Sequence, residues 1–270
     1  MRPFFENNVL QQQPFKPMII VVDTTKAGSA SNTFVLPIIK DTTETVKIYW
    51  GDGTNSTGVN GDNTHVYAVG GVYTVKIESR LFGGIYFNNL GDKAKITKIA
   101  NYGQGVSRLN IGSFYGCSSL LSIDIGNIVS NGTNAYAMFS QCTALTTVPL
   151  FNLSSVTDAY ATFAYCPVTT VPLFNLSNLI NASCMFYQCT ALTTVPLFNL
   201  SSVTDASYMF SGVTLTTQSY SDFLINLATL PLQSGVSFHG GNSKYNPAAA
   251  IARAYLVSNF GWTITDGGAA

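Results

Sequence analysis

The sequence predicts a mainly β protein with short helices, in which a β-sandwich is followed by a repeat solenoid and a C-terminal α/β cap. Two observations lead to this prediction. A motif recurs every 23–25 residues between residues 96 and 217, and β-branched and aromatic runs without that period precede it. We therefore divide the 270 residues into an N-terminal arm (1–17), a sandwich (18–80), a solenoid (81–217) and a cap (218–270).

The composition excludes several classes of function. Only 10% of the residues are charged, and 13 basic side chains balance 13 acidic ones. A nucleic-acid-binding protein normally carries a basic surface, so we expect no nucleic-acid partner. No window approaches the roughly 18 apolar residues that span a bilayer, so we expect no membrane insertion. A neutral surface of Ser, Thr, Asn and Gln is instead typical of virion and cell-surface proteins.

Within the first 17 residues, residues 7–13 are polar and rich in Gln, and Pro14 and Pro17 follow them. These 17 residues lack the basic and apolar regions of a secretory signal. We interpret them as an extended arm, which is either a disordered terminus or an attachment peptide for another virion or surface protein. Either a signal has been removed or the protein reaches its surface by another route, such as virion assembly.

Residues 18–80 contain runs that are rich in β-branched and aromatic side chains. These runs predict four strands: Met18–Asp23, Phe34–Ile39, Thr45–Trp50 and Val72–Glu78. Gly51-Asp52-Gly53-Thr54 predicts a tight turn, in which the Asp52 carboxylate accepts turn amides. The acidic and amide side chains around it lack the spacing of a calcium-binding loop, so we favour a plain turn.

The repeat has three nearly identical copies at 142–163, 166–186 and 189–210, and a looser copy at 117–139. A steady period indicates one unit that is stacked repeatedly, with its apolar side against its neighbours. One cysteine recurs in each copy, and because free Cys is a small hydrophobic residue, we predict an inward structural column: Cys117, Cys142, Cys166 and Cys189. The odd total of 5 cysteines and the lack of a CxxC pair argue against zinc.

Within each copy the apolar positions follow the leucine-rich-repeat pattern L-x-x-V-x-L-x-N-L. This pattern predicts an inward asparagine ladder of Asn127, Asn152, Asn175 and Asn199. Inward asparagines would not be glycosylated, although Asn152, Asn175 and Asn199 begin Asn-x-Ser motifs. The alternation at Val148-Pro149-Leu150 places Val and Leu inside and Pro outside. The spacing after the asparagine predicts a short helix or 3₁₀ turn on the return leg of the coil.

Aromatic side chains at repeat positions are the candidate binding residues. Phe151, Phe174 and Phe198 either pack at the edge of the coil or form an outward apolar stripe for a partner. A second set lies on or beside the return leg: Tyr136, Tyr160, Tyr165 and Tyr187. Neutral, hydroxyl-rich aromatic surfaces suit carbohydrate, and they suit subunit contacts equally.

Residues after 217 lose the period and predict a cap. The sequence predicts a helix that begins near Ser219, a strand at Val236–Phe238, a second helix from Pro247 to Gly261 and a strand at Trp262–Ile264. Solenoids need such terminal units to cover their last hydrophobic layer. No catalytic motif, no converging histidine and no paired carboxylates are found, so we expect no enzyme, no cofactor and no metal.

The segments FYGCSSL, MFSQCTAL and MFYQCTALTTVPLFNLSSVTDASYMF resemble BspA-type leucine-rich repeats, which occur in bacterial surface adhesins and tailed-phage proteins. The resemblance covers roughly residues 80–268 and implies binding or adhesion without catalysis. Gly51–Thr54, His65-Val66-Tyr67 and Gly71–Val75 resemble a PKD-type, immunoglobulin-like sandwich, a spacer or binding module of surface proteins.

These features favour a non-enzymatic surface adhesion or receptor-binding protein, in the first place an exposed phage virion component such as a tail fibre. The alternatives are a bacterial BspA-like cell-surface adhesin and a purely structural virion decoration protein. The expected partners are a host-surface glycan or protein, and other virion or surface proteins through residues 1–17. We expect a homo-oligomer or a larger assembly, located on the virion surface or, alternatively, on the bacterial cell surface.

Overall fold

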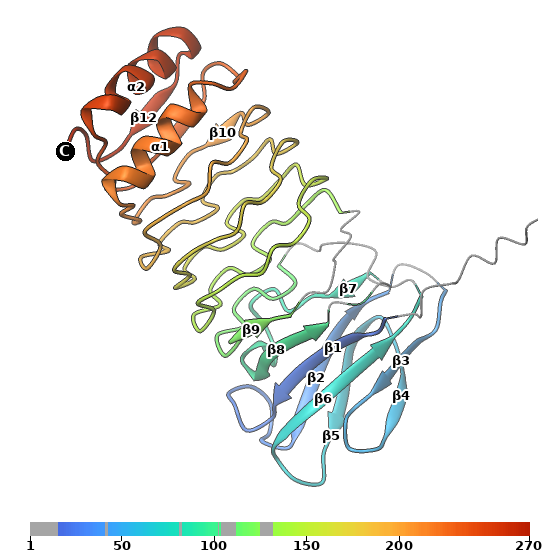
Figure 1. Ribbon diagram of the computed structural model, residues 1–270. Coiled ribbons are helices and arrows are strands. Elements are labelled where there is room, and N and C mark those ends of the chain that lie inside the picture. Colours follow the sequence, from blue (N-terminus) through green and yellow to red (C-terminus); the bar gives the residue numbers. More distant parts are fainter. Residues whose placement is uncertain (1–15, 41–42, 81–82, 102, 104–111, 125–131) are drawn as a thin grey trace, which may run out of the picture.

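The computed structural model describes residues 16–40, 43–80, 83–101, 103, 112–124 and 132–270. A unit of two β-sheets lies at one end of the molecule, a stack of coils follows, and two helices lie at the far end (Figure 1). The described part is mainly β, as the sequence predicts. The arm up to residue 15 and the predicted ladder residue Asn127 lie outside the described residues.

The β-unit contains two sheets whose inner faces form its core. The larger sheet has the order β4-β3-β6-β1-β8-β9, and the smaller has the order β5-β2-β7. Alternate residues of β1 and β2, such as Ile20 and Leu36, are buried. The larger sheet comprises β1 (Met18–Asp23), β3 (Val46–Tyr49), β4 (Asn55–Gly58), β6 (Val72–Glu78), β8 (Ile96–Asn101) and β9 (Ser122–Ile123). The smaller comprises β2 (Thr33–Ile39), β5 (Gly61–Val66) and β7 (Gly84–Ile85).

The four predicted strands are confirmed to within one residue at each end. The sequence did not reveal β4 and β5, because their polar, glycine-containing sequences lack the β-branched runs that mark buried strands. The turn before β4 is confirmed, since Asp52 Oδ1 accepts the Thr54 amide at 3.0 Å. Both sheets run past the predicted boundary at residue 80, because β7 pairs with β2 and β8 pairs with β1.

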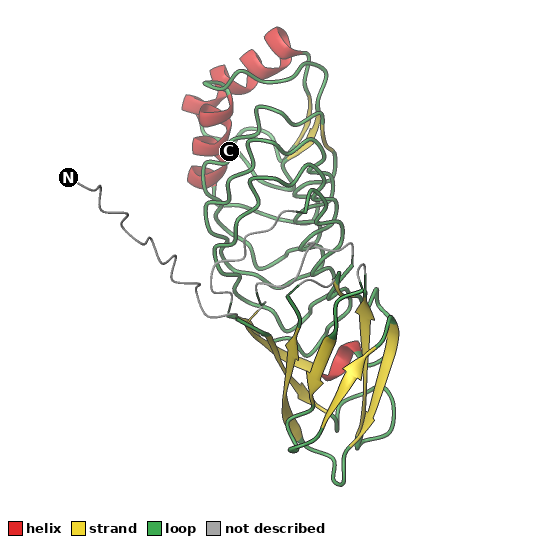
Figure 2. Cartoon of the chain, turned by 90° about the vertical axis from the view of Figure 1, so that its right-hand side faces the viewer, coloured by secondary structure: helices red, strands yellow, loops and turns green. Residues whose placement is uncertain are grey.

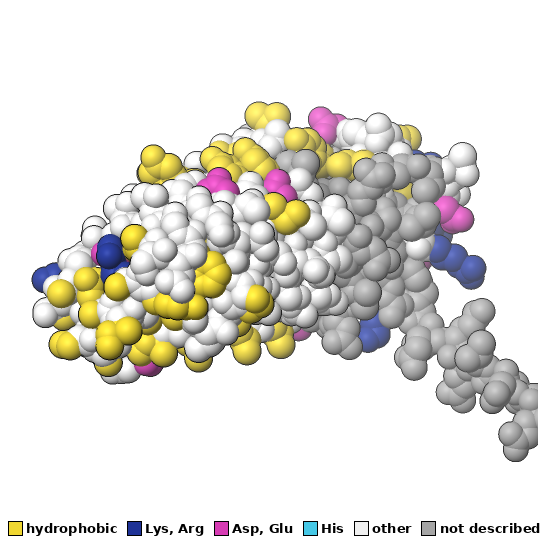
Figure 3. All heavy atoms as spheres, turned by 90° about the horizontal axis from the view of Figure 1, so that it is seen from above, with side chains coloured by type: hydrophobic (Ala, Val, Ile, Leu, Met, Phe, Trp, Pro, Cys, Tyr) yellow, Lys and Arg dark blue, Asp and Glu magenta, His cyan; other side chains and the backbone are white. Residues whose placement is uncertain are grey.

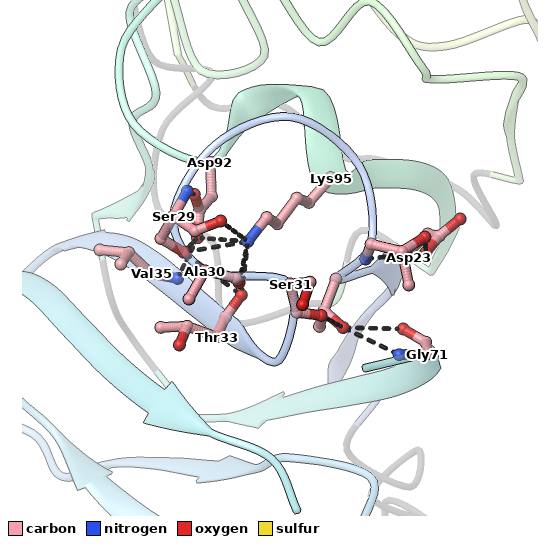
Figure 4. Close-up of polar contacts among 11 residues, drawn as sticks. Asp23, Ser29, Ala30, Ser31, Thr33, Val35, Gly71, Asp92 and Lys95 are labelled. Carbon is pink, nitrogen blue, oxygen red and sulfur yellow. Dashed lines mark hydrogen bonds and ion pairs between the residues drawn. The ribbon is translucent and has the colours of Figure 1, made fainter. Parts of the chain in front are cut away.

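A buried ion pair covers the part of the β2 edge that β7 leaves open (Figure 4). Asp92 precedes the short 3₁₀ helix η1 (Lys93–Lys95), and Lys95 ends it. Asp92 Oδ2 accepts the Val35 amide at 2.8 Å, and Lys95 Nζ donates to the Thr33 carbonyl at 2.7 Å. Lys95 also donates to Ser29 and Ala30, and both charged side chains are at most 1% exposed. Together they take the place of a neighbouring strand.

The coils stack in parallel register through backbone hydrogen bonds between corresponding segments of neighbouring coils. Ala137 donates to the Tyr160 carbonyl at 2.7 Å, and Ala161 donates to the Ser183 carbonyl at 3.1 Å. Single parallel bridges join the coils at Asn134, Asp158, Asn181 and Asp205. Figure 2 shows the coils as successive turns between the strands and the helices.

Cysteine and phenylalanine columns fill the inside of the coils. The predicted inward cysteines Cys117, Cys142, Cys166 and Cys189 are confirmed as fully buried. Their neighbours are stacked rings with centroids 5.6–5.9 Å apart: Phe114, Phe139, Phe163, Phe186 and Phe210. The cysteine thiols also donate hydrogen bonds to backbone carbonyls of these phenylalanines; for example, Cys166 Sγ donates to the Phe139 carbonyl at 3.0 Å. The interior is therefore apolar and close-packed.

The predicted asparagine ladder is wrong. Asn152, Asn175 and Asn199 are exposed, and each side chain accepts the amide two residues later, from Ser154, Ser177 and Ser201. Phe151, Phe174 and Phe198 occupy the inside at 4%, 1% and 0% exposure, so they form no outward stripe. Exposed asparagines also remove the argument against glycosylation of these motifs.

A tight turn explains why the phenylalanine lies inside the coil and the asparagine after it lies outside. The Phe174 amide donates to the Pro172 carbonyl at 2.9 Å, and the Phe198 amide donates to the Pro196 carbonyl at 3.0 Å. Such a three-residue turn breaks the strict alternation that the prediction assumed. Leu150, Leu173 and Leu197 consequently point outward, with 65%, 59% and 51% exposure. Of the two structures predicted for the return leg, a short helix or a 3₁₀ turn, the described coils have turns with the 3₁₀-type hydrogen bond, such as Met138 to the Ala135 carbonyl at 3.2 Å and Thr162 to the Ala159 carbonyl at 3.2 Å.

The cap follows the prediction closely. Helix α1 (Thr217–Leu227) begins at an N-cap, Thr216, and helix α2 (Pro247–Phe260) begins at Asn246 and ends at Gly261 in the left-handed conformation. Strands β10 (Asp205–Ala206), β11 (Ser237–His239) and β12 (Thr263–Thr265) continue the parallel ladder of the coils. The Asp266 carboxylate links α1 to α2, because it accepts hydrogen bonds from Tyr220 of α1 and Arg253 of α2, both at 2.8 Å.

Candidate functional site

Each coil has two legs that pack on one shared core. In three coils the threonine leg has the sequence TTVPL, at 146–150, 169–173 and 193–197, and in the looser first copy the corresponding residues 121–125 read LSIDI. The return leg comprises 136–141, 160–165, 183–188 and 207–212, with the sequences YAMFSQ, YATFAY, SCMFYQ and SYMFSG. Buried valines of the threonine leg and buried phenylalanines of the return leg belong to the same hydrophobic cluster.

A groove of about 470 Å³ lies along the return legs. Tyrosines form most of its wall, and small residues form its floor. Its described lining residues are Tyr115, Tyr136, Ala137, Ser140, Gln141, Tyr160, Ala161, Ala164, Tyr165, Cys184, Tyr187 and Tyr208. The four predicted tyrosines therefore surround one groove, and their binding role stays a prediction.

The floor of the groove consists of small side chains, and its backbone amides are hydrogen-bonded within the stack. Ala137, Ala161 and Ala164 are buried, and they form a small cluster beneath the tyrosines. The amides of Ala137 and Ala161 donate to carbonyls of the next coil, so these amides are already paired. The polar groups of the groove are therefore mainly hydroxyls.

The walls are aromatic pairs in contact across neighbouring coils. Tyr136 and Tyr160 stack with ring centroids 4.7 Å apart and an interplanar angle of 15°. Tyr165 and Tyr187 meet edge to face at 5.3 Å. Tyr208 is more than half exposed and stacks on His239 at 6.0 Å. Rings that support one another keep a fixed orientation, which lowers the entropy lost when a ligand binds.

The groove is electrically neutral. Among the described residues that line it, none carries a charge. The electrostatic effect of the neighbouring Cys184 thiol raises the pKa of Tyr160, and partial burial together with Tyr187 raises the pKa of Tyr165. These hydroxyls therefore stay protonated at neutral pH. Figure 3 shows few charged side chains on the face of the molecule that it displays.

The repeats differ from one another where the groove lies. Residues 142–159 and 189–206 are identical, and the difference begins at the next residue, on the return leg. The second position of the leg is nevertheless left-handed in all four coils, with φ of 50°, 52°, 57° and 57° at Ala137, Ala161, Cys184 and Tyr208. The backbone path is thus conserved within the chain while the side chains change.

Sequence reasoning missed part of the site. Tyr115, Tyr208, Cys184 and the alanine floor were not predicted, although Tyr115 and Ala164 share the repeat position of the predicted Tyr187. Aligning the six-residue return legs position by position would have shown the signal, which is tyrosine moving between positions while phenylalanine stays fixed.

Other features of the described residues fit a site less well. A shallower hollow of about 590 Å³ lies between Leu197 and Ile225 of α1, and one of about 360 Å³ lies beside β2. His65 Nε2 lies 2.7 Å from Asp52 Oδ2 and stacks on Trp50, which makes it a packing residue of the β-unit. No group of three or more His, Cys, Asp or Glu among the described residues is arranged to hold a metal ion.

Residues 111–223, which include the groove, match a protein family described as "Mycoplasma protein of unknown function, DUF285". The match supports a BspA-type surface protein in coarse terms. No curated protein and no solved structure matches the chain. None of the helices in the described part has the length and apolar character needed to cross a bilayer. The leucine-rich-repeat class, the PKD-type module and the virion setting stay predictions.

Proposed function

We propose that this chain is a non-catalytic surface adhesion protein that contacts its partner through the tyrosine groove. One observation supports this most strongly: three coils that share the threonine leg TTVPL differ on their return legs, where six tyrosines surround a floor of small residues. Tyrosine supplies contact area and hydrogen bonds at low entropic cost, which explains its frequency in recognition surfaces.

In this proposal the coils form a leucine-rich-type solenoid that holds the groove away from a PKD-like module. Residues 1–17 attach the protein to an assembly, which is an exposed virion appendage or, alternatively, a bacterial cell surface. Immunogold labelling of virions and of cells with an antibody to the chain distinguishes these two settings. A structural decoration protein is the competing function, and it predicts no binding to any host surface.

Binding of the purified chain to host cells tests the proposal. Ala164→Tyr fills the groove floor, and we expect the fold to tolerate it because Tyr115 and Tyr187 occupy the equivalent position in other coils. An unchanged thermal midpoint of the variant checks this expectation. We expect this variant to weaken cell binding at least about tenfold, because it occupies the space that the partner needs. The matched control, Thr169→Tyr, adds the same ring to the exposed threonine leg and should bind like the parent chain. Equal binding by both variants would contradict the proposal.

A further inference from the structure

The exposed side of helix α2 is unusually apolar for the end of a repeat stack. This helix lies at the end of the molecule opposite the β-unit (Figure 1). Solenoids normally close with a polar outer face, which keeps their ends in solution. On α2, however, Ile251 is 81% exposed, and Tyr255 and Val257 are 41% and 42% exposed. Of the residues of this helix, all of which the structure describes, only Ala249 and Leu256 are buried.

The exposed side of α2 also carries no charge. Arg253 is the single charged residue of this fully described helix, and it donates to the Asp266 carboxylate at 2.8 Å and to the Ile264 carbonyl at 3.2 Å. Its charge is therefore used in the inner contacts of the cap. A helix that is apolar on all sides is usually buried. Burial of the exposed side of α2 against a second surface would consequently be favourable.

The exposed residues are spaced as on a helix that packs along another helix. Four of them, at intervals of four, three and four residues, form what we call the outer line: Pro247, Ile251, Ala254 and Ser258. These intervals are those of the two seam positions of a coiled coil, so the outer line lies on one side of the helix. Ala248 and Tyr255 flank the outer line on one side, and Ala250 and Val257 flank it on the other.

The outer line fits a second copy of itself when the two helices are antiparallel. A pair centred between residues 252 and 253 sets Ile251 of each copy opposite Ala254 of the other. The same pair sets each remaining large side chain beside an alanine of the other copy: Tyr255 beside Ala248, and Val257 beside Ala250. Large side chains thus fill the space above small ones. A parallel pair would set every residue beside its own copy, so that alanine faces alanine.

We infer that α2 docks on α2 of a second copy of this chain, in an antiparallel two-fold pair. A two-fold contact uses the same patch on both chains, so the patch must fit itself. The outer line and its flanks do so in size, and because they are uncharged, two identical copies meet without like-charge repulsion. A helix of a different protein would require neither property.

The size of the contact indicates its strength. A helix of 14 residues is about 21 Å long and about 10 Å across, so its outer half offers roughly 330 Å² to a partner. A stable interface buries about 800 Å² on each side. The contact is therefore weak by itself, and we expect a dissociation constant in the micromolar range. Copies that an assembly holds together reach effective concentrations at or above this range.

Analytical ultracentrifugation of the full chain tests the inference at concentrations up to about 300 μM, well above the expected dissociation constant. We expect a dimer whose population rises with concentration. Ile251→Glu and Ala254→Lys should each weaken dimerisation at least about tenfold, because each buries charges without partners. An equimolar mixture of the two variants should dimerise again, because the introduced carboxylate of one chain then faces the introduced ammonium of the other. Leu173→Glu, a matched change of an exposed leucine on the threonine leg, should dimerise like the parent.

Each outcome of this experiment decides the inference. Loss of the dimer in each variant, with unchanged thermal midpoints, and its return in the mixture support the antiparallel pair. A parent chain that stays monomeric throughout overturns it, as does a dimer that Ile251→Glu leaves intact. A mixture that stays monomeric overturns the antiparallel pairing of Ile251 with Ala254. A monomeric parent whose cell binding Ile251→Glu weakens would identify a different protein as the occupant, and it overturns the self-pairing while the proposed function stands.

Discussion

The two legs of the coils differ in how closely their sequences are repeated from one coil to the next. In three successive coils the threonine leg repeats TTVPL without change, although Leu150, Leu173 and Leu197 are exposed. The return leg keeps its phenylalanine in all four coils and the preceding methionine in three, and no other position keeps one residue in more than two coils. Because both legs contact the same core, packing alone does not explain the difference. The comparison shows that the sequence of the threonine legs is repeated between coils whereas the sequence of the return legs varies. The variable return legs form the groove.

The largest expected effect is a loss of stability when the hydrophobic core shared by the two legs is altered. Phe163 stacks on Phe139 and Phe186 and also contacts Phe151 and Phe174. Phe163→Ala should reduce the free energy of unfolding by about 3–5 kcal/mol, because it leaves a cavity in the ring column. Denaturant unfolding measures this loss.

Leu173→Ala is the control for Phe163→Ala, since the leucine is exposed and its truncation should change stability by less than about 0.5 kcal/mol. A large effect of Leu173→Ala would break the comparison, because it would show that the threonine leg is covered by a partner or by another part of the chain.

A second large effect should arise in the β-unit, away from both legs. Lys95→Met leaves the Asp92 carboxylate buried without its counter-ion, so we expect a loss of about 3–5 kcal/mol in the free energy of unfolding. Adding Asp92→Asn should restore part of it, because no buried charge then remains. Trp50 lies in the β-unit and Trp262 in the cap, so tryptophan fluorescence of Trp262→Phe and Trp50→Phe chains shows separately how each end of the molecule unfolds. An additive double variant would contradict coupling of the pair.

These effects also show what sequence reasoning could and could not find. The cysteine column and both cap helices were predictable, because a fixed period and local capping residues such as Asn246 and Gly261 determine them. The asparagine ladder failed because the hydrophobic pattern permits two inward assignments. Only the three-residue turn between Pro172 and Phe174 decides that phenylalanine lies inside.

The groove was predictable only in part for a similar reason. Tyr136 and Tyr160 share one repeat position, so the period identifies them as a pair. Tyr115 and Tyr208 join the same groove from other positions of the unit, and only the stacking of coils brings them near the pair. The sequence period identifies residues that share one repeat position, whereas the groove is lined by residues from several repeat positions.

The smallest expected effect is the response of groove binding to pH. Tyr160 and Tyr165 have pKa values raised above the ordinary 10.0, so both hydroxyls are protonated well into the alkaline range. Burial lowers the pKa of His239, which lies beside Tyr208, below its ordinary 6.5, so this imidazole is neutral above that pH. Ligand affinity should therefore change little between about pH 7 and 9. A steep change in calorimetric titrations over this range would reveal a charged group in recognition.

The most direct test exchanges one return leg for another while every threonine leg stays the same. Replacing residues 160–165 with the sequence of residues 207–212 keeps the buried Phe163 and matches the left-handed positions, because Tyr208 and Gly212 already adopt positive φ there. The measurement is cell binding of this chain beside its thermal midpoint. We predict an almost unchanged midpoint and loss of binding. A stable exchanged chain that binds as well as its parent would contradict the claim that the variable return leg makes the site.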